Sequence, residues 1–322
     1  MNRLTGRAAV GAGAAAGLLL TASAALPRMF LRIVTDRDEP PLCKTIRSGI
    51  TKRLCNAQTC TDIIKAGAEL AAADTETIRT TATDGTALVG HLYRCEKPKR
   101  ILIAMHGWRS SWSRDFGVAA QFWHDSGCTV LFAEQRGQGS SGGNYLSFGM
   151  MERYDCLSWA NYIARNESST LPVYLVGISM GATAVLLASA LPLPQNVRGI
   201  IADCGFSSPE AIWRHVTEQK LHIPYALLRR YTDRTCKSRF GCLPAEATTA
   251  AALSRCKVPV LLIHGRDDAF VPYEMSVEAK NACACSCSLL SVDGAGHGES
   301  FLRAPELYRQ TMRRFWAEND GT

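Results

Sequence analysis

The sequence predicts one α/β domain in which a mostly parallel central sheet is flanked by helices. Short apolar runs recur along the chain without polar alternation, as is typical of strands that are buried on both faces. Segments long enough for a helix separate most of these runs, and this strand–helix alternation builds a parallel sheet. Because the crossovers of such a sheet are right-handed, its strands end at one common edge, where we expect the chemistry.

The composition is that of an ordinary globular protein, since 47% of the 322 residues are hydrophobic and 20% are charged. The net charge of +7 comes from scattered basic residues and not from a dense basic run. We therefore predict a mildly cationic surface, or a preference for an anionic membrane face, and no nucleic-acid partner.

The N-terminus carries an uncharged stretch rich in Ala and Gly, at residues 8–26, which follows Arg3 and Arg7. Its length is close to the ~20 residues that a membrane-spanning helix needs. Small residues before Ala24 also fit the cleavage site of a secretory signal. We therefore predict that residues 1–26 are either a signal peptide or a transmembrane anchor. The protein would then be secreted or membrane-anchored, with the side of the membrane left open.

The chain has 13 cysteines, an odd number, so at least one thiol is unpaired if disulfides form. No C-x-x-C spacing occurs, and the alternating Cys283, Cys285 and Cys287 would share one face of a strand, which suits tetrahedral zinc poorly. No nucleotide-binding glycine fingerprint follows the first strand. We predict neither a resident metal nor a cofactor.

Residues 27–76 are predicted to form a helical extension. Apolar residues recur there with helical spacing, at Ile46, Ile50, Leu54, Ile63 and Ile64. The catalytic domain is predicted to follow, over residues 77–320.

The catalytic domain is predicted to begin with a β-hairpin at Asp84 and Gly85, since apolar alternation flanks this turn pair. The later apolar runs predict strands at 101–105, 129–133, 173–177, 197–202, 258–263 and 289–292. Helices are predicted at 112–126, 151–165 and 180–191. The alternation breaks at about residues 207–252, a stretch with aromatic and basic residues and no clear strand. We predict that this stretch is a helical lid over the sheet edge.

The strongest chemical signal is the G-x-S-x-G pattern from Gly177 to Gly181, which predicts Ser179 as a nucleophile. A buried strand precedes it and a good helix follows, so a sharp turn would lift the hydroxyl out at the sheet edge. Residues 139–143 also match the pattern, but no helix follows directly. Ser141 is therefore assigned no catalytic role.

A serine hydroxyl needs a base, and His297 is the predicted one because it lies in a small-residue loop after the last strand. His264 is the rival, but a histidine at the end of a strand is more often structural. Asp268 is predicted to orient His297, with Asp267 facing solvent and Asp203 as a spare acid.

Two backbone amides are predicted to form an oxyanion hole. Met180 directly follows the nucleophile at a helix N-terminus, and Trp108 lies in the loop after the strand at 101–105. His106 would shape that loop and take no part in proton transfer.

Six motifs occur together in a characteristic order. They are HGW (106–108), EQRGQGSSGG (134–143), GISMGA (177–182), ADCGFSS (202–208), HGRDDAFVP (264–272) and GAGHGES (294–300). From about Thr77 to Trp316 the chain resembles the α/β-hydrolase superfamily, in particular the membrane-anchored bacterial group described as serine aminopeptidase S33-like.

The resemblance implies the α/β-hydrolase fold, a triad of Ser179, Asp268 and His297, and oxyanion donors at Trp108 and Met180. The sequence departs from the family pattern at two loop positions, with Glu134 as the acidic residue and Gln138 where a histidine is common. Both departures concern loop packing, and the triad is untouched.

The predicted function is hydrolysis of a carboxylic ester, a lipid or a related small acyl compound through an acyl-enzyme. An aminopeptidase with a peptide substrate is the nearest alternative. It would need an acidic pocket, whereas the predicted lid carries more bases than acids. A non-catalytic binding protein of the same fold, and haloperoxidase, dehalogenase or C–C hydrolase chemistry, are further alternatives.

Overall fold

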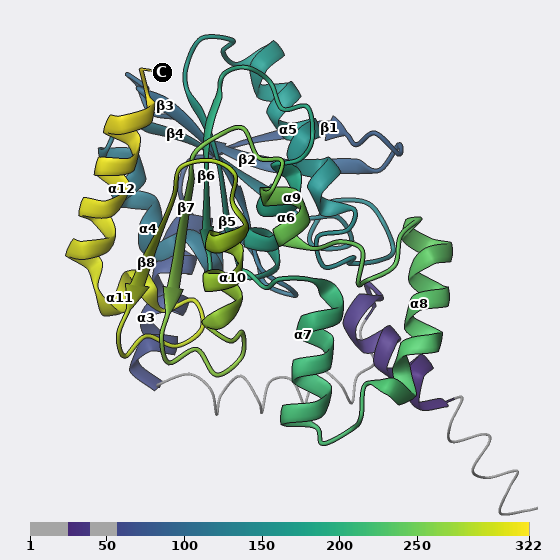
Figure 1. Cartoon of the computed structure of the whole chain (residues 1–322). Helices are drawn as coiled ribbons and strands as arrows, with labels where there is room; N and C mark the ends of the chain where they lie inside the picture. Colours follow the sequence, from purple (N-terminus) through teal and green to yellow (C-terminus); the bar gives the residue numbers. More distant parts are fainter. Residues whose placement is uncertain (1–24, 39–56, 322) are drawn as a thin grey trace, which may run out of the picture.

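An eight-stranded sheet forms the centre of the molecule in the computed structural model, which describes residues 25–38 and 57–321 (Figure 1). The spatial order is β1-β2-β4-β3-β5-β6-β7-β8. The strands are β1 (Glu76–Thr81), β2 (Ala87–Tyr93), β3 (Arg100–Met105), β4 (Cys128–Glu134), β5 (Val173–Ile178), β6 (Val197–Asp203), β7 (Val260–Gly265) and β8 (Cys287–Val292). β1 and β2 pair antiparallel, β2 pairs antiparallel with β4, and the strands from β3 to β8 run parallel. The predicted sheet and hairpin are confirmed.

Two boundaries differ from the prediction because of proline. β7 begins at Val260 and not at residue 258, since Pro259 has no N–H for the strand ladder. The helix after the nucleophile ends at Ala188 and not at Leu191, because Pro192 disfavours helical backbone at the residue before it. β8 begins at Cys287, so Cys283 and Cys285 lie before the strand.

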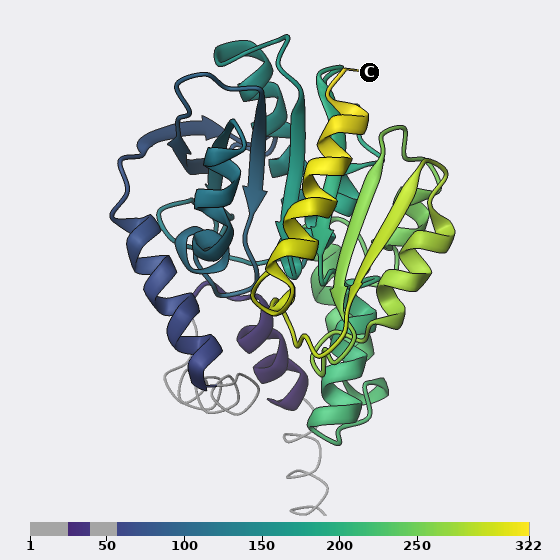
Figure 2. The same cartoon turned by 90° about the vertical axis from the view of Figure 1, so that its left-hand side faces the viewer.

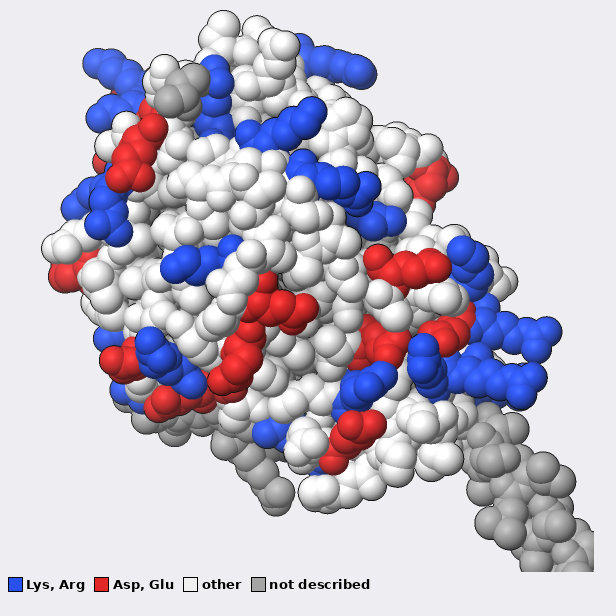
Figure 3. Space-filling view, in the orientation of Figure 1, with Lys and Arg blue, Asp and Glu red and all other residues white. Residues whose placement is uncertain are grey.

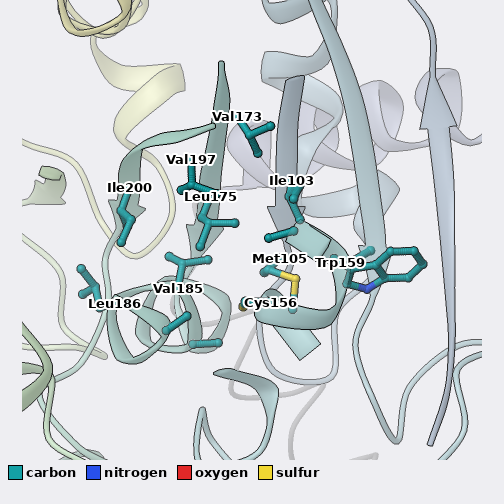
Figure 4. Close-up of a cluster of buried hydrophobic side chains, with 14 of the residues drawn as sticks. Ile103, Met105, Cys156, Trp159, Val173, Leu175, Val185, Leu186, Val197 and Ile200 are labelled. Atoms are coloured by element: carbon teal, nitrogen blue, oxygen red, sulfur yellow. The ribbon is translucent and has the colours of Figure 1, made fainter. Parts of the chain in front are cut away.

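Helices cover both faces of the sheet. One face packs against α5 (Glu152–Asn166), α6 (Met180–Ala188) and α10 (Glu274–Ala282). The other packs against α3 (Ala57–Ala71), α4 (Trp112–Asp125), α11 (Ser300–Arg303) and α12 (Pro305–Asn319). Figure 2 shows α12 lying along the second face, and Figure 4 shows the side chains that fill the first. Strands such as β3 and β4 are buried throughout, which explains the apolar runs at 101–105 and 130–133.

The segment between β6 and β7 is helical, in agreement with the predicted lid. It contains α7 (Pro209–His215), a π-helical turn η1 (Val216–Lys220), α8 (Ala226–Phe240) and α9 (Thr249–Leu253). α7 and α8 lie beyond the carboxyl ends of the parallel strands (Figures 1 and 2). The lid is held there by a third apolar cluster, to which Phe206, Trp213 and Tyr225 contribute.

Residues 25–38, here called the N-terminal strap, pack into this same cluster although they precede the sheet by many residues. The strap is helical over 25–35 and buries Phe30 and Leu31. The ring of Phe30 meets that of Trp213 edge-on, with 6.1 Å between centroids. In Figure 1 the strap is the purple helix between α7 and α8. It is therefore part of the same cap as the lid.

Much of the predicted N-terminal organisation falls outside the described residues. The predicted signal or anchor at 1–26 lies there almost wholly, as do Ile46, Ile50 and Leu54, whereas Ile63 and Ile64 lie on α3. Within residues 25–38 and 57–321, no helix combines the length and the apolar character that crossing a bilayer requires.

The cationic character predicted from composition is visible on α8. Figure 3 shows Lys and Arg side chains gathered at the edge of the molecule where α8 lies. Arg229, Arg230, Arg234 and Lys237 are exposed on this helix.

Candidate active site

Ser179 occupies the sharp turn between β5 and α6, at the carboxyl edge of the sheet. Its φ of 55° lies in the left-handed region, which non-glycine residues rarely adopt. A Cβ on Gly181 would lie 1.8 Å from the carbonyl oxygen of Met105, and a Cβ on Gly177 would lie 2.3 Å from that of Gly181. Glycine is therefore required on both sides of Ser179, because the backbone of the turn packs so closely.

Three side chains that are far apart in sequence meet at this turn. Nε2 of His297 lies 2.9 Å from the hydroxyl oxygen of Ser179, across a sequence separation of 118 residues. Nδ1 of the same ring lies 2.7 Å from Oδ2 of Asp268. With Nδ1 donating to the carboxylate, the lone pair of Nε2 faces the serine hydroxyl, as base-assisted attack requires. The structure thus brings together all three side chains that the sequence predicted for this site.

Asp268 is held in its ionised form. Burial alone would raise its pKa, but His297 and His264 beside the carboxylate, with the backbone amide of Val271, bring the pKa well below its ordinary value. Oδ1 accepts from the amides of Phe270 and Val271, both at 2.8 Å. The neighbouring Asp267 is exposed, as predicted.

The pKa of His297 depends on burial and on two neighbouring side chains. Burial alone would lower its pKa, but Cys204 and Asp268 raise it well above the ordinary value of 6.5. Its side chain keeps 27% of its surface exposed, so the ring is not closed off from solvent. The ring of Phe270 packs edge-on against it, with 5.1 Å between centroids.

The loop after β3 lies directly beside the nucleophile. A Cβ on Gly107 would be 3.4 Å from Cβ of Ser179. The amide of Gly107 donates to Oδ2 of Asp115 at 2.7 Å, and Ser110 also donates to that carboxylate. The loop that carries Trp108 is thereby anchored to the first turn of α4. Met180 is the first residue of α6, so its amide is among those with no acceptor inside the helix.

The N-terminal strap holds this loop from the other side. The indole Nε1 of Trp108 donates to the carbonyl of Val34 at 2.9 Å. The guanidinium of Arg109 donates to the carbonyls of Ile33 and Asp36, at 2.8 and 2.6 Å from Nη2. Arg109 has a φ of 51°, another left-handed conformation. Contacts from residues 70 or more positions away therefore fix the predicted oxyanion loop.

The second G-x-S-x-G match has a structural role. Ser141 is fully buried, and its hydroxyl donates to the carbonyl of Glu134 at 2.6 Å while accepting from the amide of Val89 at 2.9 Å. Arg37 of the strap donates to the carbonyls of Ser141 and Gly139, both at 2.7 Å. This glycine-rich loop therefore braces β2 and the strap.

The rival base His264, the loop residue His106 and the spare acid Asp203 also have structural partners. His264 lies fully buried with Nδ1 2.6 Å from the hydroxyl of Ser276, and its Nε2 is 3.3 Å from Oδ2 of Asp268. Nε2 of His106 accepts from the amide of Gln135 at 3.2 Å, and burial lowers its pKa. Asp203 accepts from the hydroxyl of Ser300 at 3.2 Å, and burial raises its pKa to about 7.

The family model described as "Alpha/beta hydrolase family" matches residues 101–311, which include every one of these site residues outside the strap. The chain belongs to the alpha/beta hydrolase family. The match begins at β3 and therefore omits the strap, β1 and β2.

One relative of this α/β hydrolase is a distant bacterial protein. The chain is 26% identical over 199 residues to the uncharacterized protein YqkD of Bacillus subtilis (strain 168), a match that covers 62% of this chain. The match spans 65% of YqkD, less than two thirds of that protein's length.

Solved esterases share the fold. The Pyrococcus furiosus esterase PF2001 is similar with a TM-score of 0.61 and 20% identity, over 77% of this chain and 92% of that one. Est1E from Butyrivibrio proteoclasticus, solved with ferulic acid bound, is similar with a TM-score of 0.57 and 18% identity, over 76% of this chain and 100% of that one. At these identities the likeness establishes the α/β-hydrolase fold.

Three features of this hydrolase's site escaped the sequence analysis. The strap contacts have no local signal, because their partners are distant in sequence. Asp115 could have been noted as an acidic residue in the first turn of a helix, four positions after the N-cap Ser111. Cys204 lies within the quoted motif ADCGFSS, yet nothing in the motif shows that its thiol lies beside His297.

Proposed function

We propose that this chain is a serine hydrolase that cleaves a carboxylic ester or related acyl compound through an acyl-enzyme. The observation that carries the proposal is the hydrogen-bonded series from Ser179 through His297 to Asp268, at 2.9 and 2.7 Å. A serine hydroxyl becomes a competent nucleophile when a positioned base removes its proton. The fold shared with solved esterases supports the same class of reaction.

The proposed reaction has two halves. Oγ of Ser179 attacks the acyl carbon while its proton passes to Nε2 of His297, and Asp268 stabilises the imidazolium through Nδ1. The negative oxygen of the tetrahedral intermediate is stabilised by the amides of Met180 and Trp108. The intermediate then expels the alcohol, which takes the proton from His297. Water attacks the resulting ester on Ser179 by the same steps and releases the carboxylic acid.

The apolar surroundings favour an apolar acyl group. Met180 directly follows Ser179, and Val271 lies three positions after Asp268. Both are buried in the apolar cluster that the lid and the strap share. Trp108, Phe148 and Trp213 form a continuous aromatic series in that cluster, with ring centroids 6.0 and 5.2 Å apart. Most of these side chains are buried under the lid and the strap, so an acyl chain reaches them when the lid opens. Its burial there contributes about 25 cal/mol per Å² of apolar surface. A lipid or a medium-chain ester is the substrate type we propose.

An S33-type aminopeptidase is the second candidate, and one observation favours it. The lid holds a pocket of about 520 Å³ that Glu210 and Glu218 line together with Arg214 and His215. Within the described part of the chain, Oε2 of the buried Glu210 has no hydrogen-bond partner, so it could receive a substrate ammonium group. The adjacent Arg214, which pairs with the same carboxylate, opposes this use. Aminoacyl arylamides therefore belong in the substrate panel beside acyl esters.

The test is labelling of the full-length protein with a fluorophosphonate probe, beside the Ser179→Ala and Ser141→Ala variants. We expect labelling of the wild type and of Ser141→Ala, and none of Ser179→Ala. Equal labelling of Ser179→Ala and the wild type would refute the assignment of the nucleophile. A folded wild type that neither labels nor hydrolyses any ester or arylamide would indicate a non-catalytic binding protein. The same preparations then define the acyl-chain preference with esters of increasing length.

The predicted membrane attachment through residues 1–26 stays a proposal of its own. A lipid substrate would be consistent with it. Fractionation of cells that express the full-length chain, with and without residues 1–24, distinguishes a retained anchor from a cleaved signal.

A further inference from the structure

Cys204 is a buried cysteine that the proposed mechanism does not use. It directly follows β6, has no exposed surface and adopts a φ of 48°. This conformation is uncommon for a residue with a side chain, and such outliers gather at functional sites. Its thiol lies beside the imidazole of His297 on the inner side of the site.

The thiol completes a compact set of metal-binding groups. A sulfur of Cys204, a carboxylate oxygen of Asp268 and a ring nitrogen of His297 all lie within 4.8 Å of one another. Over residues 25–38 and 57–321, this is the one set of three or more such side chains whose donor atoms lie so close together. The ligand atoms of a tetrahedral zinc site are slightly closer than this, so small side-chain rotations would bring them into range.

The chemistry of the donor set selects the kind of cation. Thiolate and imidazole are preferred ligands of zinc and its neighbours, whereas magnesium and calcium prefer oxygen ligands. One thiolate and one carboxylate also balance the charge of a divalent ion, so the buried site becomes neutral when it is filled. Three protein ligands would leave the fourth position of a tetrahedral ion for water.

We propose that Cys204, Asp268 and His297 form an inhibitory binding site for a zinc-class divalent cation. The cation displaces the thiol proton, which goes to solvent, and the imidazole stays neutral. With one ring nitrogen bound to the metal, the other carries the ring proton, so His297 cannot accept the proton of Ser179. The inhibition rests on the function proposed above, whereas the binding of the cation does not. The sequence shows no metal-binding motif at this site, because the fold brings its three ligands together from separate loops.

Binding can be measured without any substrate. Cobalt(II) is a spectroscopic substitute for zinc, and a thiolate ligand gives it a charge-transfer absorption in the near ultraviolet. Full-length, metal-free protein would be titrated with cobalt as the wild type and as Ser179→Ala, Cys204→Ser and His297→Gln. Cys156→Ser is the matched control, since Cys156 is equally buried but lies on α5, outside the set.

We expect the same tight-binding phase of the absorption in the wild type, in Ser179→Ala and in Cys156→Ser. In Cys204→Ser and in His297→Gln this phase should be lost, because the apparent affinity for cobalt should fall by about tenfold or more. An unchanged titration in both of these variants would overturn the proposal. If one of the two does not fold, as circular dichroism would show, the other carries the comparison.

Inhibition is measured separately with zinc chloride and the fluorophosphonate probe. Zinc should slow labelling of the wild type and of Cys156→Ser, and about tenfold more zinc should be needed for Cys204→Ser. Equal sensitivity of Cys204→Ser and the wild type would overturn the inhibitory role. If the wild type never labels, the proposed function fails, and the cobalt titration still decides whether the cation binds.

Discussion

The carboxylate of Asp115 accepts a hydrogen bond from the backbone amide of Gly107, with 2.7 Å between Oδ2 and the nitrogen. Gly107 directly precedes Trp108, whose amide is the proposed second donor to the oxyanion. The first turn of α4 therefore sets the position of a group that we propose acts on the substrate, although no contact places Asp115 itself at the reacting atoms.

Replacement of Asp115 by alanine should lower kcat more than it changes KM. The loop would lose its anchor, and loss of one oxyanion donor costs about 10²–10³ in kcat, so a displaced donor should cost about tenfold to a hundredfold. Steady-state kinetics on a good ester would measure the effect. The control is Asp125→Ala, because Asp125 lies at the other end of the same helix, where its carboxylate accepts from the exposed Gln121 and lies 3.8 Å from Nδ1 of His124. Unaltered kcat in Asp115→Ala would show that the loop is positioned without this bond.

The pH dependence of hydrolysis should report His297. Below its pKa the imidazole is protonated and cannot take the proton of Ser179, so kcat/KM should rise with pH. Because burial is outweighed by Cys204 and Asp268, the pKa lies above 6.5, and the midpoint of the rise should too. Initial rates at low substrate concentration across the pH range give this midpoint directly.

Replacement of Asp268 by asparagine should act on both the rate and this midpoint. The maximal rate should fall by about 10⁴-fold, because the tautomer and the imidazolium lose their support. The residual activity should titrate at lower pH, since the carboxylate that raises the pKa of His297 is gone. The exposed neighbour Asp267→Asn is the matched control and should leave both quantities close to those of the wild type. A midpoint that stays in place in Asp268→Asn would mean that another group titrates.

Replacement of Arg109 by alanine should release the N-terminal strap. Several hydrogen bonds from one charged side chain to strap carbonyls would be lost, and bonds to charged groups contribute about 1.5–3 kcal/mol each. We expect amide hydrogen exchange in residues 25–38 to accelerate by about tenfold or more. Arg114→Ala, on the exposed face of α4, is the control. Unchanged exchange in the strap of Arg109→Ala would show that its apolar contacts suffice to hold it.

The sequence was informative wherever a local rule links residue type to backbone shape. Glycines around Ser179 are demanded by close packing of the turn, so the motif could be recognised without a structure. Asp268 follows the buried strand β7 and His297 follows the edge strand β8. Parallel strands end at one edge of a sheet, which is why the three side chains were predicted together. The sheet followed from the recurring apolar runs, and the helical lid followed from the break in that pattern at about residues 207–252.

The remaining features depend on contacts between distant segments. Trp108 and Val34 are 74 positions apart, and neither residue type predicts the hydrogen bond between them. The thiol of Cys204 acquires its neighbours from a left-handed backbone conformation that its local sequence does not reveal. The start of β7 depends on Pro259, which has no N–H for the strand ladder, a property that the apolar pattern alone does not reflect.

The strap has a consequence for how this protein can exchange segments with its relatives. A recombination junction before residue 25 would keep the strap together with the rest of the fold. The carbonyls of Val34 and Ile33 would then still accept from the side chains of Trp108 and Arg109. A junction after residue 38 would replace the strap with a segment from another protein. The ring of Trp213 would then lose its contact with Phe30, and Trp108 and Arg109 would lose their hydrogen-bond acceptors. The strap, the lid and the loop after β3 are therefore expected to be inherited together, although three separate stretches of the gene encode them.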